Sequence, residues 1–241
     1  MNDAQITPGV YLKVDGAFDC KELFDRGITM SGVHSIQPLV NQLTDVYCDM
    51  KTNGGGWTVL LKRNDGSVNF NRSWNEYKIG FGSVSSDYWI GNEVIHHLTR
   101  QTNSMLYVSI THVNGSTFYE KYNEFSISGE ADGYSLHFGG ASGTLGDAMT
   151  PATFSRGHLN GMKFTTIDKD QDESDGANCA ILVGGGGGWW YKQCRWALLT
   201  GPYGSTDWKY PWVPKSKSGF KSGIDIRRVR MMVKRKGTQE D

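Results

Sequence analysis

The sequence lacks the features of a membrane-spanning, strongly charged or repetitive protein. No apolar run approaches the roughly 18 residues that a transmembrane helix needs. The 25 Lys and Arg residues are balanced by 25 Asp and Glu residues, so the basic excess of a typical nucleic-acid reader is missing. Proline is scarce, at 6 residues, and no internal or heptad repeat occurs. These absences argue against membrane insertion, nucleic-acid binding and a coiled coil.

Glycine and aromatic residues are abundant instead. The 31 glycines, without periodicity, indicate many turns and irregular loops. The 8 Trp, 11 Tyr and 10 Phe residues supply core material and argue against disorder. A chain of 241 residues is compatible with one large β-rich domain or two small ones, and it can bury a sizeable core without disulfides.

The cysteines and two sequons bear on the compartment. The four cysteines are Cys20, Cys48, Cys179 and Cys194. They allow three pairings and form no CxxC zinc pattern, and the alternative is buried free thiols in a cytosolic protein. The sequons at Asn71 and Asn114 favour a secreted glycoprotein. The opening residues MNDAQITPG lack the basic and apolar regions of a signal peptide, so we expect that a secreted form has had its signal removed.

Periodicity predicts a mixed scaffold of short helices and antiparallel strands up to about residue 165. Helices are expected over 18–27 and 88–98, and strands over 30–40, 43–50, 57–61, 105–113, 116–125, 134–138 and 224–233. Asn114-Gly115 is a strong hairpin signal, and 139–149 is expected to be a loop. His96 and His97 are adjacent and do not share a helix face, so we expect surface residues and not metal ligands.

Residues 166–223 have little periodicity, as long functional loops often do. Aspartates alternate near the start of this segment, at Asp168, Asp170 and Asp172. In an extended loop Asp170 and Asp172 point the same way and can converge on one Ca²⁺, which prefers six to eight oxygen ligands. The carbonyl groups of Ser174 and Gly176 can complete that set. The alternative is a solvated acidic loop. The glycine run 184–188 is not followed by Lys-Ser/Thr, so we interpret it as a flexible pocket rim and not a phosphate loop.

Many short motifs, in one order, resemble a known family. They are VYCDM (46–50), GGGWTVL (54–60), DGSVNFNRSWNEYKIGFG (65–82), YWIGNE (88–93), KYNEF (121–125), GMKFTTIDKDQD (161–172), NCA (178–180), GWWYKQC (188–194) and RMMVKR (230–235). From about residue 19 to 235 the chain is similar to the fibrinogen C-terminal-like domains of ficolins, tachylectins, angiopoietins and fibrinogen.

The resemblance implies an α+β fold with a central antiparallel sheet, short helices and a loop-rich calcium- and ligand-binding region. We expect a lead-in over 1–16, one domain over 17–236 and a tail over 237–241. Within that domain the expected parts are an N-terminal part (17–56), a central sheet part (57–165 plus 224–235) and a loop-rich binding part (166–223).

The resemblance also implies specific site residues. It pairs Cys20 with Cys48 and Cys179 with Cys194, and the second bridge stabilises by roughly 3 kcal/mol in the loop-entropy model. It makes Asp170, Asp172 and the carbonyls of Ser174 and Gly176 the calcium ligands, with Asp168 as an outer carboxylate. One extra residue precedes Cys179, which bears on the carbonyl ligands more than on the carboxylates. In relatives the bond before this Cys is cis, which predicts a cis Asn178–Cys179 peptide.

The predicted ligand pocket departs from the family pattern. Acetyl-binding relatives carry an aromatic residue and a His where this chain has Val183 and Arg195, so we expect weak binding of free N-acetylated sugars. Arg195 offers a planar fork suited to carboxylate, sulfate or phosphate groups. Trp196, Tyr203, Trp208 and Tyr210 are candidates for stacking on a sugar, with Trp212 nearby. The alternative is that these rings are core, since Trp is usually highly buried.

The sequence therefore predicts a secreted, extracellular, non-enzymatic domain that uses Ca²⁺ to bind acetylated or acidic glycans on microbial surfaces, as an innate-immune lectin. The alternative is a protein-binding module that docks a receptor or an extracellular-matrix partner. By resemblance, the full-length protein is expected to be an oligomer that gains avidity through a stalk.

Overall fold

A computed structural model describes residues 16–100, 103–150, 158–182, 185–194, 197–204, 212 and 226–237. The helices are α1 (Cys20–Asp25), η1 (Thr52–Gly54), α2 (Trp74–Ile79), α3 (Asn92–Thr99), η2 (Glu130–Asp132) and α4 (Cys179–Leu182). The strands are β1 (Gly32–Leu39), β2 (Gln42–Asp49), β3 (Trp57–Arg63), β4 (Phe81–Gly82), β5 (Tyr88–Trp89), β6 (Ser104–His112), β7 (Thr117–Ile127), β8 (Leu136–Gly143) and β9 (Ile226–Arg235).

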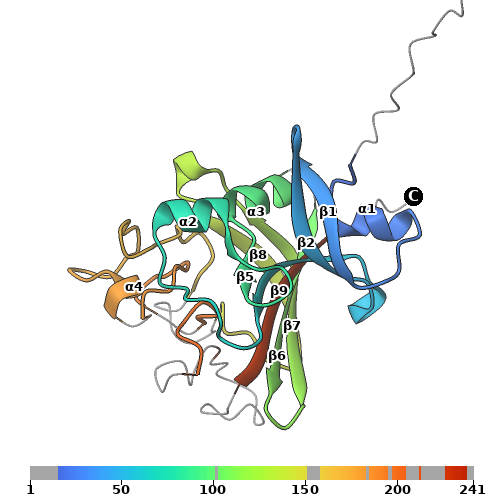
Figure 1. Cartoon of the computed structure of the whole chain (residues 1–241). Helices are drawn as coiled ribbons and strands as arrows, with labels where there is room; N and C mark the ends of the chain where they lie inside the picture. Colours follow the sequence, from blue (N-terminus) through green and yellow to red (C-terminus); the bar gives the residue numbers. More distant parts are fainter. Residues whose placement is uncertain are drawn as a thin grey trace, which may run out of the picture.

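One antiparallel sheet forms the centre of the molecule. Within the described residues it has nine strands in the order β1-β2-β3-β9-β6-β7-β8, with β5 added beside β3 and β4 beside β5. The last strand, β9, lies between β3 and β6, so the end of the chain joins the middle of the sheet (Figure 1). The predicted α+β class, central antiparallel sheet and return of the final strand are confirmed.

The short helices begin where side chains cap them. Asp19 accepts the Glu22 N–H at 2.8 Å ahead of α1, and Ser73 with Glu76 forms a capping box ahead of α2. Helix α3 buries Val94, Ile95 and Leu98 at helical spacing. No helix among the described residues is long and apolar enough to cross a membrane.

Strand β8 differs from its prediction. The expected strand 134–138 and loop 139–149 are wrong in their boundary, because β8 runs from Leu136 to Gly143. Its second half, GGASG, has no apolar alternation, yet it pairs with β7 from Glu124↔Gly139 to Glu120↔Gly143. Backbone hydrogen bonds sustain this pairing, and residues with small side chains form these bonds as well as residues with large ones.

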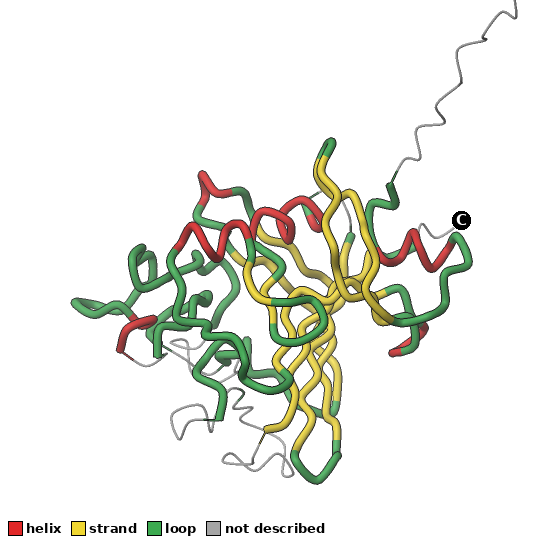
Figure 2. The backbone as a smooth tube through the Cα atoms, in the orientation of Figure 1, coloured by secondary structure: helices red, strands yellow, loops and turns green. Residues whose placement is uncertain are grey.

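The loops gather to one side of the sheet, as Figure 2 shows. An aromatic cluster joins them to the scaffold: Tyr77 of α2 and Trp89 of β5 pack with Phe164 and Trp190 of the loop-rich part. The ring centroids of Phe164 and Trp190 are 5.0 Å apart, and those of Tyr77 and Phe164 are 5.2 Å apart. Edge-on contacts of this kind add to the hydrophobic gain from burial.

Candidate calcium and ligand-binding region

The acidic loop starts from a short paired segment. Thr165 and Trp189 exchange backbone hydrogen bonds of 2.9 and 3.1 Å, and Thr166 pairs with Lys169. Gln171 then donates its side-chain amide to the Phe164 carbonyl at 2.6 Å. The loop that carries the aspartates is therefore anchored at its base.

Asp170 and Asp172 lie close together at the loop's turn. Asp172 accepts the N–H of Ser174 on one carboxylate oxygen and that of Cys179 on the other, both at 2.8 Å. Its own N–H donates to Asp170 at 3.3 Å. Burial raises the pKa of Asp172, the charge of Asp170 adds to the rise, and the two N–H groups oppose it. Two neighbouring carboxylates of this kind are stabilised by a cation.

The donor set has the chemistry that calcium prefers. Asp170 is exposed and Asp172 half-buried, and the backbone turns at Asp175–Gly176, directly after Ser174, so the turn includes one predicted carbonyl ligand and follows the other. Gly176 has a φ of +76°, which a side chain would strain. No cluster of three metal-ligating side chains occurs in the part of the chain that the structure describes, so a calcium ion at this position would need carbonyl and water oxygens in addition to the two carboxylates.

Asp168 has a structural role. One of its carboxylate oxygens accepts the Trp74 N–H at 2.8 Å and the Thr166 hydroxyl at 2.7 Å. Trp74 is the first residue of α2, where backbone N–H groups lack partners within the helix. Lys169 lies over the Trp74 ring, at 3.7 Å from its centroid. Asp168 thus fastens the acidic loop to α2.

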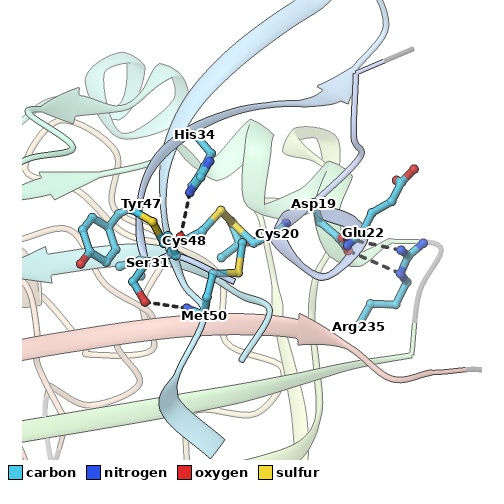
Figure 3. The surroundings of a disulfide bond; sticks show 12 residues. Asp19, Cys20, Glu22, Ser31, His34, Tyr47, Cys48, Met50 and Arg235 are labelled. Atoms are coloured by element: carbon cyan, nitrogen blue, oxygen red, sulfur yellow. Dashed lines mark hydrogen bonds and ion pairs between the residues drawn. A yellow bond between two sulfur atoms is a disulfide. The ribbon is translucent and has the colours of Figure 1, made fainter. Parts of the chain in front are cut away.

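Both predicted disulfides are present. Cys179 and Cys194 have Cα atoms 5.1 Å apart and close the segment behind the acidic loop. Cys20 and Cys48 join α1 to β2 with a Cα separation of 5.5 Å (Figure 3). Beside this second bridge Asp19 forms an ion pair with Arg235 of β9 at 3.4 Å.

The Asn178–Cys179 peptide corrects one prediction. No cis peptide bond occurs among the described residues, so this bond is trans. In this geometry the Cys179 N–H reaches Asp172, and the Asn178 side chain accepts the Ala180 N–H at 2.8 Å while donating to the Thr166 carbonyl at 2.9 Å. The polar groups of this turn are satisfied without the roughly 3 kcal/mol that a cis bond costs.

The glycine run corrects a second prediction. A Cβ at Gly187 would lie 2.5 Å from the Thr200 carbonyl oxygen, and one at Gly188 would lie 2.7 Å from the Tyr77 ring. Gly187 and Gly188 are packed against the core and do not form a flexible rim, whereas Gly185 is exposed and Gly184 lies outside the described residues. The adjacent Trp189 and Trp190 are also buried, and Trp190 donates to the Tyr134 carbonyl at 2.7 Å. The sequence signal that could have revealed this close packing is the position of the glycines directly before the large Trp189 and Trp190 rings.

The structure places part of the predicted ligand pocket. Val183, Arg195, Trp196, Trp208 and Tyr210 lie outside the described residues. The Tyr203 hydroxyl lies 2.8 Å from the Arg227 carbonyl oxygen and 3.1 Å from that of Asn64, so its polar end binds the backbone. Trp212 is fully buried and donates to the Gly146 carbonyl at 2.6 Å, so this ring is core.

A buried ion pair beneath the loops was not anticipated from the sequence. Arg63 of β3 and Asp87 are 3.4 Å apart and almost completely buried. Arg63 donates to the Gly201 carbonyl at 2.8 Å, while Asp87 accepts the N–H groups of Asn64, Asp65 and Gly66. The pair joins the sheet to the segment 197–204. Its sequence signal is the pair of charged residues, Lys62 and Arg63, at the end of a largely apolar strand.

Both predicted glycosylation positions lie at the surface, whereas His96 and His97 are half-buried. Asn71 is exposed and forms a bridge with Gly187, and Asn114 is exposed at the tip of the β6–β7 hairpin. Glycosylation of either side chain stays a prediction. His96 contacts the Ile127 carbonyl at 2.9 Å, and His97 contacts Glu93 at 3.2 Å.

The chain belongs to the fibrinogen C-terminal domain family. The family profile described as "Fibrinogen beta and gamma chains, C-terminal globular domain" matches residues 17–234. Among curated proteins, human ficolin-3 is 40% identical over 226 residues, which cover 91% of this chain and 71% of ficolin-3. Bovine fibroleukin is 35% identical over 231 residues, which cover 90% of this chain and only 51% of fibroleukin.

Solved structures show the same fold. The fibrinogen-like globe domain of human ANGPTL2 is 32% identical with a TM-score of 0.78, and the match covers 91% of this chain and 99% of that one. Lamprey fibrin D-dimer, complexed with the peptide ligand Gly-His-Arg-Pro-amide, is 28% identical with a TM-score of 0.77. That match covers 100% of this chain and 81% of the lamprey chain.

Proposed function

We propose that this chain is a secreted recognition domain that uses calcium to bind acetylated or acidic glycans on microbial surfaces, in the manner of an innate-immune lectin. The observation that carries the proposal is the Asp172 carboxylate. It stands beside Asp170 and also holds the N–H of Cys179, at 2.8 Å. Asp172 thereby links the predicted calcium site to the Cys179–Cys194 loop. This loop ends directly before Arg195, one of the predicted ligand-binding residues.

Other observations support the proposal. Two disulfides are typical of an oxidising, extracellular compartment. The similarity to ficolin-3 covers 91% of the chain. Bound calcium would supply the positive charge that holds Asp170 and Asp172 together, while the protein's own hydrogen bonds orient Asp172. Assembly of the full-length protein into an oligomer belongs to the same proposal.

Thermal unfolding of the Asp170→Ala variant tests the calcium site. Asp170 makes few internal contacts, so this variant should melt like wild type in EDTA and below wild type in millimolar calcium. A ligand at about 100 times its Kd stabilises by about 2.7 kcal/mol. Asp172→Ala should be destabilised in both media, because it also loses two backbone hydrogen bonds. A calcium-induced rise of melting temperature in Asp170→Ala equal to that of wild type would refute the assignment.

A glycan array, probed in calcium and in EDTA, tests the ligand class. Hits on acetylated or acidic glycans that vanish in EDTA support the proposal. Calcium-independent hits, or none, contradict it.

A second candidate function is protein binding. It is favoured by Ile181 and Leu182 of α4, which are 64% and 63% exposed beside the acidic loop and form an apolar pair. The lamprey neighbour is a complex with a short peptide. An Ile181→Ser/Leu182→Ser variant that loses a protein partner but keeps its glycan hits would establish this function.

A further inference from the structure

A row of cations and hydroxyl groups lies on the face of the sheet that points away from the loop-rich part. In the ladder, Lys62 of β3 stands opposite Arg230 of β9, Arg230 opposite Ser109 of β6, and Ser109 opposite Tyr119 of β7. The next row is Arg228, Thr111 and Thr117. Directly paired residues share one face of a sheet, so these side chains line a common surface.

Adjacent residues of β3 show that this face is separate from the calcium loop. Arg63 donates to the Leu199 and Gly201 carbonyls under the loops. Lys62, the preceding residue, must point to the opposite face. Its ammonium group lies 4.5 Å from the Tyr47 ring centroid and 3.0 Å from the Ser85 carbonyl oxygen. The two faces of one strand therefore serve different regions.

Two adjoining hollows cross this face, with volumes of about 520 and 180 Å³. Both are lined by Thr52 and Arg230, so they form one continuous depression, which we call the outer groove. Its lining includes Lys51, Thr52, Ser109, Thr111, Arg228 and Arg230. Tyr107 and Tyr119 stack beside it, with centroids 5.1 Å apart and planes within 9°.

The charge of the outer groove is positive and only partly compensated. Asp49 is its one lining carboxylate among the described residues, and it lies 3.3 Å from Arg230. Asp49 is also occupied by the Thr52 and Lys51 N–H groups at 2.8 and 3.0 Å. Arg228 is exposed and has no ion pair within the described chain. Burial lowers the pKa of Lys62, and the positive charges of Arg230 and Arg228 lower that pKa further. The three cations therefore lie close enough to repel one another.

The lining favours one class of ligand. Arginine presents a planar fork of donors that matches sulfate and carboxylate groups. Ser109, Thr111 and Thr117 add hydroxyl groups, which suit the hydroxyl groups of a sugar. Met30 is the one aliphatic side chain among the described lining residues, and Tyr47 and Tyr107 add aromatic rings on which a sugar can stack. The chain's zero net charge gives no general attraction for nucleic acid.

We propose that the outer groove is a second binding site, which takes a linear glycan carrying sulfate groups and needs no calcium. It would hold a sulfated matrix or cell-surface chain on one face of the sheet while the calcium loop on the other side remains available. The proposal does not depend on the function proposed above for the calcium loop, and either can fail alone.

The test uses a heparin-derived octasaccharide as the probe and isothermal titration calorimetry as the measurement. Arg228→Ser and Arg230→Ser should each weaken binding about tenfold, which is the loss expected for one charge-assisted contact. Arg227→Ser is the matched control. It removes the same charge from the adjacent exposed residue, which does not line the outer groove, and should change affinity less than about twofold. Affinity in EDTA should equal that in calcium.

Several outcomes would overturn the proposal. They are no octasaccharide binding by wild type at millimolar concentration, an equal loss in Arg227→Ser, a requirement for calcium, or equal affinity for a polyglutamate peptide of the same charge. Because Arg230→Ser exposes Asp49, its melting temperature is measured, and Arg230→Lys provides a second variant that keeps the charge near Asp49. An Arg230→Lys affinity between those of wild type and Arg228→Ser supports the site, and an Arg228→Ser affinity equal to that of wild type contradicts it.

Discussion

The sheet and the loop-rich part of this protein are held together in different ways. In the sheet, long ladders such as β6–β9 satisfy the backbone, and side chains are left to pack. Between residues 158 and 204 the described segments contain only isolated bridges and one four-residue helix. Side chains therefore form many of the hydrogen bonds to backbone N–H and C=O groups there. Asp172, Asn178 and Gln171 each bind main-chain groups there. A loop region of this kind depends on a few polar residues in a way that the sheet does not.

The strongest test of this comparison removes the ion pair that joins the two regions. Arg63→Ala leaves Asp87 buried without its charged partner, and we expect a loss of about 3–5 kcal/mol in the free energy of unfolding. Urea denaturation monitored by tryptophan fluorescence measures it. Arg227→Ala, an exposed change of the same type, should cost less than about 0.5 kcal/mol. A loss below about 1 kcal/mol for Arg63→Ala would show that the loops do not depend on the sheet through this pair.

The two disulfides allow a second comparison, since one lies in each region. Their sequence separations of 28 and 15 predict similar stabilisation, about 3.6 and 3.0 kcal/mol. Replacing either pair by serine should therefore lower stability to a similar extent. The calcium-dependent rise of the melting temperature should disappear only without Cys179–Cys194, because Asp172 binds the N–H of Cys179. Scanning calorimetry with and without calcium measures both effects, and an equal calcium response in the two variants would contradict the idea.

The same contrast explains what the sequence could predict. Strands β1, β2, β6 and β7 fall within a few residues of their predicted ranges, because alternating side chains and an Asn-Gly turn encode them locally. The second half of β8 was not predicted, because its pairing depends on backbone groups and its small residues show no alternation of apolar and polar side chains. The return of the last strand to the central sheet was predicted from its strand-forming residues, but its position between β3 and β6 was not.

Prediction was weaker for the site. The alternating aspartates were visible as residue types at a given spacing, and the cysteine pairing followed from the resemblance to the family. The contacts that hold them were not, since Asn178, Arg63 and Asp87 bind backbone groups distant in sequence. The glycine run was misread because glycine indicates either mobility or close packing, and only the neighbouring Tyr77 ring and Thr200 carbonyl decide between them.

The smallest expected effect separates structural from ion-binding aspartates within one loop. Asp168→Ala removes the acceptor for the Trp74 N–H and the Thr166 hydroxyl, and we expect a loss of about 1 kcal/mol. This loss should be the same in calcium and in EDTA, because the carboxylate is occupied by α2 and not by an ion. Asp170→Ala is the comparison, with a loss confined to calcium. Thermal unfolding of both variants in both media measures the difference. If Asp168→Ala were destabilised only in calcium, Asp168 would belong to the ion's own ligands, and the division of roles in this loop would be wrong.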